Sequence, residues 1–211
     1  MYSHIIWDWN GTLYDDVQWC IQCINVMLAK RGLPLLGSVE AYHGVFGFPV
    51  IDYYRRLGFD FGKEPFDEIA IEFIGIYHGA DCSASLFPGA EQLLSNCRQQ
   101  GIRQVILSAS EKSNLMSQVG PLGISQYFDE VLGISDIYAK SKISLGREYI
   151  NMAKPQNAVL VGDTAHDKET ADALGVGCIL VAGGHQSKQS LLSSGAPVVD
   201  RLGDVKQYIN V

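Results

Sequence analysis

SHIIWDWNGTL, residues 3–13, contains the first strand predicted for this chain and the turn that follows it. Residues 3–7 form a short, mostly apolar run, which is typical of a buried strand. Asp8 closes that strand, and a Gly-containing loop at residues 10–12 follows. Because open α/β sheets bind ligands beyond the carboxyl ends of their strands, Asp8 is the first candidate site residue.

The pattern from about residue 15 to residue 85 is helical, with no convincing strand. Apolar residues recur at helical spacing from Val17 to Leu28, after two aspartates and before Lys30-Arg31-Gly32. Further helices are predicted over residues 50–57 and 66–78. This stretch is therefore expected to form a separate helical unit.

Strands and helices alternate beyond Pro88-Gly89. The predicted strands span residues 104–107, 130–132, 158–162, 178–181 and 197–199. The predicted helices include residues 90–100, 144–153 and 168–174. Such alternation predicts βαβ units and a parallel sheet covered on both faces. Since the first strand stands apart from the others, we predict an α/β fold with a helical insertion after its first strand.

Composition excludes several classes of protein. The chain has 211 residues, 47% of them apolar, which argues for a folded domain plus a smaller unit and against disorder. Its net charge of −7 is a poor match for nucleic acid. No apolar run reaches the ~18 residues of a membrane span, and the N-terminus lacks a signal-peptide pattern. We therefore expect a cytoplasmic protein with no nucleic-acid or membrane partner, and the sequence leaves its oligomeric state open.

The five cysteines are odd in number and irregularly spaced. Cys20 and Cys23 form a C-x-x-C pair, a pattern that occurs in redox and zinc sites. They lie in an apolar-periodic helix with no second ligand pair nearby in the sequence, so buried thiols are the favoured interpretation. This cysteine usage fits a reducing cytoplasm.

Polar residues close three predicted strands at one edge of the sheet, namely Asp8, Ser108 and Asp163, and Asp167 follows shortly after. Three carboxylates repel one another unless a cation lies between them. Oxygen ligands without Cys or His suit Mg²⁺ best. The sequence therefore predicts a Mg²⁺ site at Asp8, Asp163 and Asp167. The alternative for any one of them is a cap at a strand-to-helix turn.

Four motifs resemble those of the haloacid dehalogenase superfamily. DWNGTL, residues 8–13, resembles the first motif, which reads D-x-D-G-T-L in the phosphatases. Ser108, closing an apolar strand, resembles the second, and GDTAHD, residues 162–167, resembles the fourth, G-D-[ST]-x-x-D. The third motif is a single Lys. Lys142, at the start of a predicted helix, is its best match, and Lys140 is a weaker one.

The resemblance implies a Rossmann-like parallel sheet core with an α-helical cap domain inserted after the first strand. Residues 1–14 and 87–211 would form the core domain and residues 15–86 the cap domain. The helical cap and LFPGA, residues 86–90, resemble the phosphoglycolate phosphatase-like branch. The chain would then be a Mg²⁺-dependent phosphatase acting on a small phosphorylated metabolite.

The resemblance also implies roles for the motif residues. Asp8 would attack phosphorus and form an aspartyl-phosphate, which divides one difficult displacement into two easier steps. Lys142 would neutralise both the phosphate and Asp8. The expected Mg²⁺ ligands are Asp8, the backbone carbonyl of Asn10, Asp163 and Asp167. The expected phosphate-binding groups are Ser108, Lys142 and the backbone N–H groups of Trp9 and Ala109.

Asn10 departs from the motif, because the family's phosphatases have an Asp there that protonates the leaving group and activates water. Losing a general acid/base typically costs ~10²–10⁴-fold in rate. Asn10 could still orient a water in a slow phosphatase, or the substrate could be an acyl or aryl phosphate that needs no proton. His166 or His43 could supply the proton instead. A long-lived aspartyl-phosphate would make a phosphotransferase, and a chain without turnover would be a phospho-ligand-binding protein.

YHGVFGFP, residues 42–49, is expected to face the active site in this family. Its aromatic residues and glycines suit a loop that closes over substrate, and His43 is an expected substrate-binding residue. Arg55 and Arg56 could meet a second anionic group. The alternative is that the aromatic residues form the cap core and the arginines lie on a solvated face.

Overall fold

The computed structural model describes residues 2–79, 84–134 and 142–210, so Cys82 and Lys140 lie outside the described residues. Its main sheet is parallel, in the order β5-β4-β1-β6-β7-β8. The strands are β1 (His4–Trp7), β4 (Arg103–Glu111), β5 (Glu130–Ile134), β6 (Ala158–Gly162), β7 (Gly177–Val181) and β8 (Val198–Val199). This arrangement confirms the predicted α/β fold, with β1 in the middle of the sheet.

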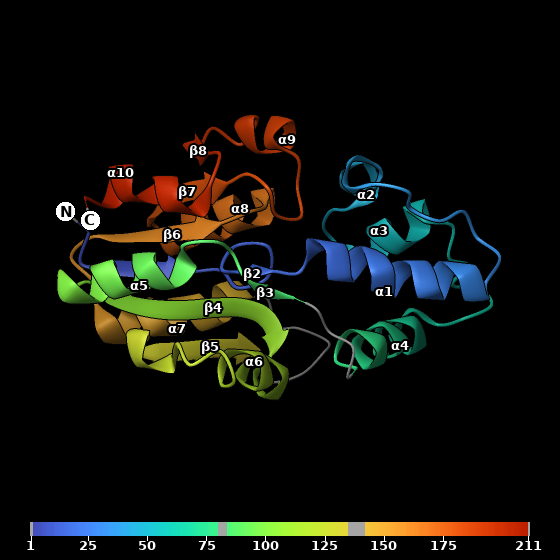
Figure 1. Cartoon of the computed structure of the whole chain (residues 1–211), viewed down its shortest axis with the longest axis horizontal. Helices are drawn as coiled ribbons and strands as arrows, with labels where there is room; N and C mark the ends of the chain where they lie inside the picture. Colours follow the sequence, from blue (N-terminus) through green and yellow to red (C-terminus); the bar gives the residue numbers. More distant parts are fainter. Residues whose placement is uncertain (1, 80–83, 135–141, 211) are drawn as a thin grey trace.

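Helices cover both faces of the sheet (Figure 1). Ile5 and Trp7 of β1 pack in one core with α5 (Ala90–Gln99), α6 (Lys112–Val119) and α10 (Lys206–Ile209). Ile6, between them in sequence, packs in the opposite core with α7 (Lys142–Ala153) and α8 (Ala165–Leu174). The alternation follows from the two-residue period of a strand, and burial on both faces explains why β1 is a continuous apolar run.

A helical unit lies beside the sheet, at the end opposite the two chain termini (Figure 1). Its helices are α1 (Val17–Lys30), α2 (Val39–Val45), α3 (Val50–Arg56) and α4 (Phe66–Tyr77). They bury a core of their own that includes Ile24, Met27 and Ile69. The chain enters and leaves this unit through an antiparallel ribbon of β2 (Tyr14–Asp15) and β3 (Ser85–Leu86). The division into residues 1–14 with 87–211 and residues 15–86 stays a proposal, with its boundaries at this ribbon.

Several elements differ from the sequence predictions. Part of the expected loop at residues 42–49 is helical, because Ser38 caps α2 by accepting a hydrogen bond from the N–H of Ala41 at 3.2 Å. β4 continues past Ser108, since its pairing with β5 resumes at Glu111 after a register shift. The short strands β2 and β3, which were not predicted, lie at the two ends of the stretch predicted to be helical. Among the described residues, no helix has the length and apolar character needed to cross a bilayer.

The predicted helix at residues 168–174 starts earlier than expected, as α8 begins at Ala165. The remaining C-terminal helices, α9 (Lys188–Leu192), α10 and the 3₁₀ turn η2 (Leu202–Val205), were not predicted. They are short, and a short segment shows too little periodicity to be recognised.

Candidate active site

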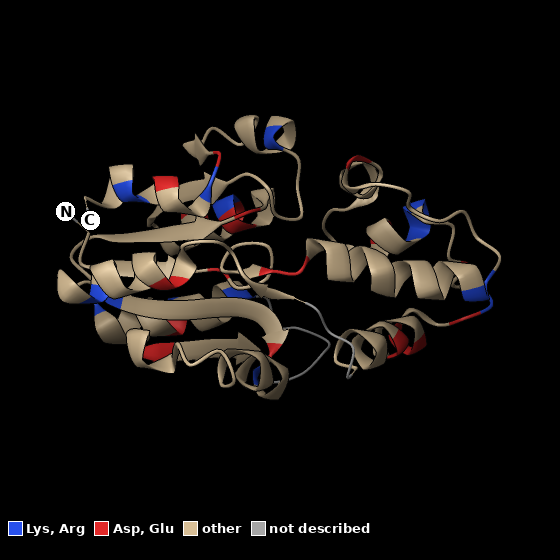
Figure 2. Cartoon of the chain, viewed as in Figure 1, with Lys and Arg blue, Asp and Glu red and all other residues tan. Residues whose placement is uncertain are grey.

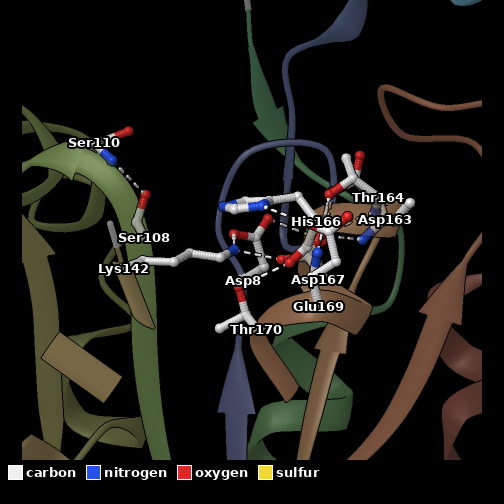
Figure 3. Close-up of polar contacts among 12 residues, drawn as sticks. Asp8, Ser108, Ser110, Lys142, Asp163, Thr164, His166, Asp167, Glu169 and Thr170 are labelled. Carbon is white, nitrogen blue, oxygen red and sulfur yellow. Dashed lines mark hydrogen bonds and ion pairs between the residues drawn. The ribbon is translucent and has the colours of Figure 1, made fainter. Parts of the chain in front are cut away.

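Three carboxylates meet at the carboxyl edge of the sheet (Figure 3). Asp8 follows β1, Asp163 follows the neighbouring strand β6, and Asp167 points back from the first turn of α8. One oxygen of each lies within 4.8 Å of the other two, and all three residues are buried. The structure therefore brings together the carboxylates proposed from the sequence as a metal site.

Asp167 is both a helix cap and a member of this cluster. Its Oδ2 accepts a hydrogen bond from the N–H of Thr164 at 3.0 Å, and its own N–H donates to Thr164 Oγ1 at 3.3 Å, which together form a capping box. Its Oδ1 accepts a hydrogen bond from Lys142. Burial acts to raise the pKa of Asp167, but Lys142 and Thr164 outweigh it and the pKa lies below its usual value. Asp167 therefore caps α8, as the alternative interpretation of the sequence has it, and it also belongs to the carboxylate cluster.

Lys142 is the first residue of α7, and its side chain reaches the cluster from the far side of β1 (Figure 3). Its buried Nζ donates to Asp8 Oδ1 at 2.8 Å and to Asp167 Oδ1. Burial acts to lower the pKa of Lys142, but the two carboxylates raise it above its usual value. The ammonium group therefore stays charged and offsets part of the negative charge.

The loop after β1 packs directly on the carboxylates. The hydroxyl of Thr12 lies 3.2 Å from Asp8 Oδ2 and 3.0 Å from Asp163 Oδ1, so Thr12 links this loop to both carboxylates. Gly11 has a φ of +72°, and a Cβ there would lie 2.3 Å from Asp163 Oδ2. Glycine is therefore required at position 11 by both conformation and space.

The charge of the cluster favours a bound cation. Burial raises the pKa of Asp8 to about 6, with Lys142 acting in the opposite direction. Burial also raises the pKa of Asp163 to about 8, and repulsion by Asp8 and Asp167 adds to that effect. A divalent cation would relieve both penalties. Three oxygen donors without a thiol or imidazole among them fit Mg²⁺.

The proposed phosphate-binding residues lie around this cluster. Ser108 is buried on β4, beside β1, and its Oγ accepts a hydrogen bond from the N–H of Ser110 at 3.0 Å (Figure 3). Ala109 follows it and is exposed. The ring of Trp9 points into the core, where its Nε1 donates to Gln118 at 2.9 Å. Only the backbone of Trp9 is therefore available for the role proposed from the sequence.

Asn10 is held by hydrogen bonds at both ends of its amide. Its Nδ2 donates to Asp16 Oδ2 at 2.8 Å and to the hydroxyl of Tyr77 at 2.9 Å. Its Oδ1 accepts a hydrogen bond from Ser110 at 3.0 Å. Both amide hydrogens thus have acceptors. The structure gives a physical reason for Asn at this position, because the side chain faces a buried carboxylate.

The two histidines proposed as proton donors have other partners. His43 Nε2 donates to the carbonyl oxygen of Gly184 at 2.9 Å, which links the helical unit to the loop after β7. His166 lies 3.2 Å from Glu169 and stacks on Phe48, with 4.7 Å between ring centroids. Phe48 belongs to the helical unit, and this stacking places it against the fourth motif, which is the position that a segment closing over the site would take.

The arginines proposed to meet a second anion make local contacts. Arg55 pairs with Asp52 at 2.5 Å and lies over the ring of Phe61, and Arg56 donates to the carbonyl of Val45 at 2.6 Å. All of these partners belong to the helical unit. The contacts favour the alternative that the arginines lie on a solvated face.

Asp16 and His185 are buried site residues that the sequence analysis missed. His185 Nε2 lies 3.2 Å from Asp16 Oδ1, and its Nδ1 lies 2.8 Å from the hydroxyl of Tyr42 in α2. Burial acts to lower the pKa of His185, but Asp16 raises it to about 9. Figure 2 shows acidic residues in the segment that enters α1, where Asp16 lies. His185 could have been found from the sequence, because it is a polar residue that follows Gly183-Gly184, just past the strand predicted at residues 178–181.

Known proteins resemble this chain over most of its length. A family model described as haloacid dehalogenase-like hydrolase matches residues 5–181. A phosphoglycolate phosphatase of Cupriavidus necator is 31% identical over 210 residues, covering 94% of this chain and 89% of that protein. The tyrosine-protein kinase PtkA of Mycobacterium tuberculosis is 28% identical over 190 residues, covering 86% of this chain and 62% of the kinase, less than two thirds of its length.

Solved structures share the fold. A haloacid dehalogenase-like hydrolase from Streptococcus pneumoniae superposes with a TM-score of 0.83 at 21% identity, covering 99% of this chain and 98% of that one. A phosphoglycolate phosphatase homologue from Lactobacillus delbrueckii gives a TM-score of 0.83 at 22% identity, with the same coverage.

Proposed function

This chain belongs to the haloacid dehalogenase-like hydrolase family, in its phosphoglycolate phosphatase-like branch, and on that premise we propose that it is a Mg²⁺-dependent phosphatase. Its substrate would be a small phosphorylated metabolite, hydrolysed through an aspartyl-phosphate on Asp8. The observation that carries this proposal is the buried cluster of Asp8, Lys142, Asp163 and Asp167 at the carboxyl edge of the sheet.

Asp8 is the proposed nucleophile because it closes the central strand and is oriented by two neighbours. Lys142 holds one of its carboxylate oxygens, and Thr12 contacts the other. In the first step an Asp8 oxygen would bond to phosphorus as the bond from phosphorus to the leaving oxygen breaks. In the second step water would release phosphate and restore the Asp8 carboxylate.

The remaining groups position and neutralise the phosphoryl group. Mg²⁺, bound by Asp8, Asp163, Asp167 and the Asn10 carbonyl, would supply positive charge to the transferring phosphoryl group. Lys142 would add a fixed charge that needs no reorganisation during the reaction. The proposed donors to phosphate oxygens are Ser108 and the backbone N–H groups of Trp9 and Ala109. His43 is proposed to contact substrate after exchanging its bond to Gly184.

The hydrogen bonds of Asn10 limit the kind of substrate. Both of its amide hydrogens are bonded to other residues, and an amide does not exchange a proton usefully at neutral pH. Leaving groups that depart without a proton, as in acyl and aryl phosphates, should therefore turn over faster than alkyl phosphates. A phosphotransferase is the second candidate, because Asn10 cannot activate water as a carboxylate would and the aspartyl-phosphate would persist. The kinase PtkA among the relatives accords with that alternative.

Steady turnover of a panel of alkyl, aryl and acyl phosphates, with and without Mg²⁺, tests the proposal. We expect Mg²⁺-dependent turnover by the parent and none by Asp8→Asn. Asp172→Asn is a matched control, because Asp172 is an exposed carboxylate on α8 that pairs only locally with Lys168. Retained turnover in Asp8→Asn would refute the assignment. Leaving-group release that rises on adding a second acceptor, with the phosphoryl group recovered on that acceptor and not as free phosphate, would favour the phosphotransferase, and binding without turnover would favour a phospho-ligand-binding protein.

A further inference from the structure

The proposed function leaves the C-x-x-C pair of α1 unexplained. Cys20 lies one helical turn after Asp16, and the fold brings His185 from the loop after β7 to the same point. One donor atom from each of Asp16, Cys20 and His185 lies within 4.8 Å of the other two. We propose that these three side chains bind a Zn²⁺-like divalent cation, at a site distinct from the carboxylate cluster.

The spacing of the donor atoms resembles that of a tetrahedral zinc site. His185 Nε2 lies 3.2 Å from Asp16 Oδ1, and Cys20 Sγ lies 3.6 Å from Asp16 Oδ2. With zinc bonds of about 2.0 Å to N and O and about 2.3 Å to S, tetrahedral ligands lie about 3.3 Å apart for O and N and about 3.5 Å apart for O and S. Both distances are close to these values, and they involve different oxygens of Asp16, so the carboxylate would turn to place one oxygen beside both partners or would bind the ion through both oxygens.

The two clusters have different donor atoms and would therefore bind different ions. A thiolate and an imidazole favour Zn²⁺ over Mg²⁺, whereas the cluster around Asp8 offers only carboxylate oxygens. On binding, Cys20 would lose its thiol proton and His185 its Nε2 proton, and both protons would pass to solvent. Three protein ligands leave the fourth position for water or the second oxygen of Asp16.

The surroundings of the donors are those of a supported ligand set. His185 Nδ1, on the far side of the ring from the proposed ion, lies 2.8 Å from the hydroxyl of Tyr42. Asp16 accepts hydrogen bonds from the N–H of Gly11 at 2.9 Å and from the hydroxyl of Tyr77 at 2.5 Å. Such outer hydrogen bonds orient metal ligands and make them more basic. The imidazole and the carboxylate are therefore already held in one orientation each.

A bound ion would join two parts of the fold. Asp16 and Cys20 lie where the chain enters the helical unit, and His185 follows a strand of the main sheet. Tyr42 contacts His185, and His43 contacts Gly184 of the same loop. Zn²⁺ at this point would hold the helical unit against the sheet and so inhibit any step that requires the two to separate.

Titration of the full chain with Co²⁺ in excess Mg²⁺ tests the site, because thiolate ligation of Co²⁺ gives a near-ultraviolet charge-transfer band. We expect this band in the parent and in Cys23→Ser, the matched control one turn further along α1, and its loss in Cys20→Ser. Zn²⁺ affinity, measured by competition with a chromophoric chelator, should fall by at least ~100-fold in Cys20→Ser, beyond the effect of losing an outer partner.

The Asp8→Asn variant separates this site from the proposed catalytic one. It should keep the Co²⁺ band, whether or not the phosphatase proposal holds, because Asp8 is not among the three ligands. Absence of the band in the parent would overturn the proposal, and so would its persistence in a folded Cys20→Ser. Should Cys20→Ser fail to fold, the titrations of the parent and of Cys23→Ser decide together, since an absent band in the parent refutes the site and a band in both proteins supports it.

Discussion

An aspartate in place of Asn10 would face the buried carboxylate of Asp16. In the structure Asn10 Nδ2 donates to Asp16 Oδ2 at 2.8 Å, and after Asn10→Asp two carboxyl oxygens would meet there. Two unit charges at that distance repel by about 6 kcal/mol at an effective dielectric constant of about 20. Keeping the new carboxyl group protonated at neutral pH costs less than this repulsion. We therefore expect it to be protonated and to donate a hydrogen bond to Asp16.

The cost of that proton sets the size of the effect and its pH dependence. An ordinary Asp has a pKa of about 3.9, and each pH unit above it adds about 1.36 kcal/mol to the cost of keeping it protonated. Asn10→Asp should therefore lower the free energy of unfolding by about 4 kcal/mol at pH 7 and about 1.5 kcal/mol at pH 5. The loss in unfolding free energy grows with pH because the folded variant keeps a proton on Asp at position 10, whereas the unfolded chain releases it above the ordinary pKa of Asp.

Urea unfolding of Mg²⁺-free protein, followed by circular dichroism at both pH values, measures this difference. The double variant, Asn10→Asp with Asp16→Asn, is compared with Asp16→Asn alone, because Asp16 also pairs with His185. In that background Asn10→Asp should cost much less than it does in the parent. Asn151→Asp, at an exposed position on α7, should change stability by less than about 0.5 kcal/mol. An Asn10→Asp variant as stable as the parent at pH 7, or a loss that Asp16→Asn does not reduce, would refute the contact.

The same double variant tests the missing general acid/base. With position 16 neutral, the carboxyl group at position 10 is free to titrate, and turnover of alkyl phosphates should rise at least about tenfold, within the ~10²–10⁴ that such catalysis supplies. Aryl and acyl phosphates should gain much less, because their leaving groups need no proton. Intact-mass analysis must come first, since Asn10 precedes Gly11 and can deamidate. Equal rates for parent and double variant would show that position 10 carries no proton.

Further outcomes follow from the same geometry. Asp163→Ala should weaken Mg²⁺ binding in calorimetry more than Asn10→Ala, because Asn10 is expected to offer only its backbone oxygen; equal losses would make its side chain a ligand. Without Mg²⁺, the free energy of unfolding should fall as pH rises from 5 to 9, since Asp163, with a pKa of about 8, and His185, with a pKa of about 9, bind more protons folded than unfolded. A rising curve over that range would contradict these shifts. Gly184→Ala should cost about 1–3 kcal/mol in thermal unfolding, because a Cβ there would lie 2.2 Å from Asp163 Oδ2. Gly203→Ala, with open space around it, is the control, and equal stability of the two variants would contradict this packing.

The carboxylate cluster was predictable from sequence for a simple reason. Asp8 and Asp163 directly follow apolar runs, and the ends of parallel strands meet at one edge of a sheet. Asp167 follows within one helical turn, so its position depends on Asp163 alone. Lys142 needed the family resemblance, because nothing about a single Lys at a helix start indicates that it reaches two carboxylates.

The partners of Asn10 could not be predicted in the same way. Asp16 is near in sequence, but its bonds to Tyr77 and His185 depend on how the helical unit packs against the sheet. The sequence pattern shows which face of a helix is apolar, and it does not show which loop a buried polar side chain meets. For the same reason the C-x-x-C pair appeared to have no further ligands, whereas the fold places His185 beside Cys20.

The proposed mechanism requires that Asp8 becomes phosphorylated during turnover. The direct measurement incubates the parent with Mg²⁺ and an aryl phosphate, quenches the reaction in acid, and maps the phosphorylated peptide by mass spectrometry. We expect phosphate on the peptide that contains Asp8, and neither phosphopeptide nor turnover in Asp8→Asn. Continued turnover by Asp8→Asn, or phosphate on a different residue of the parent, would contradict it.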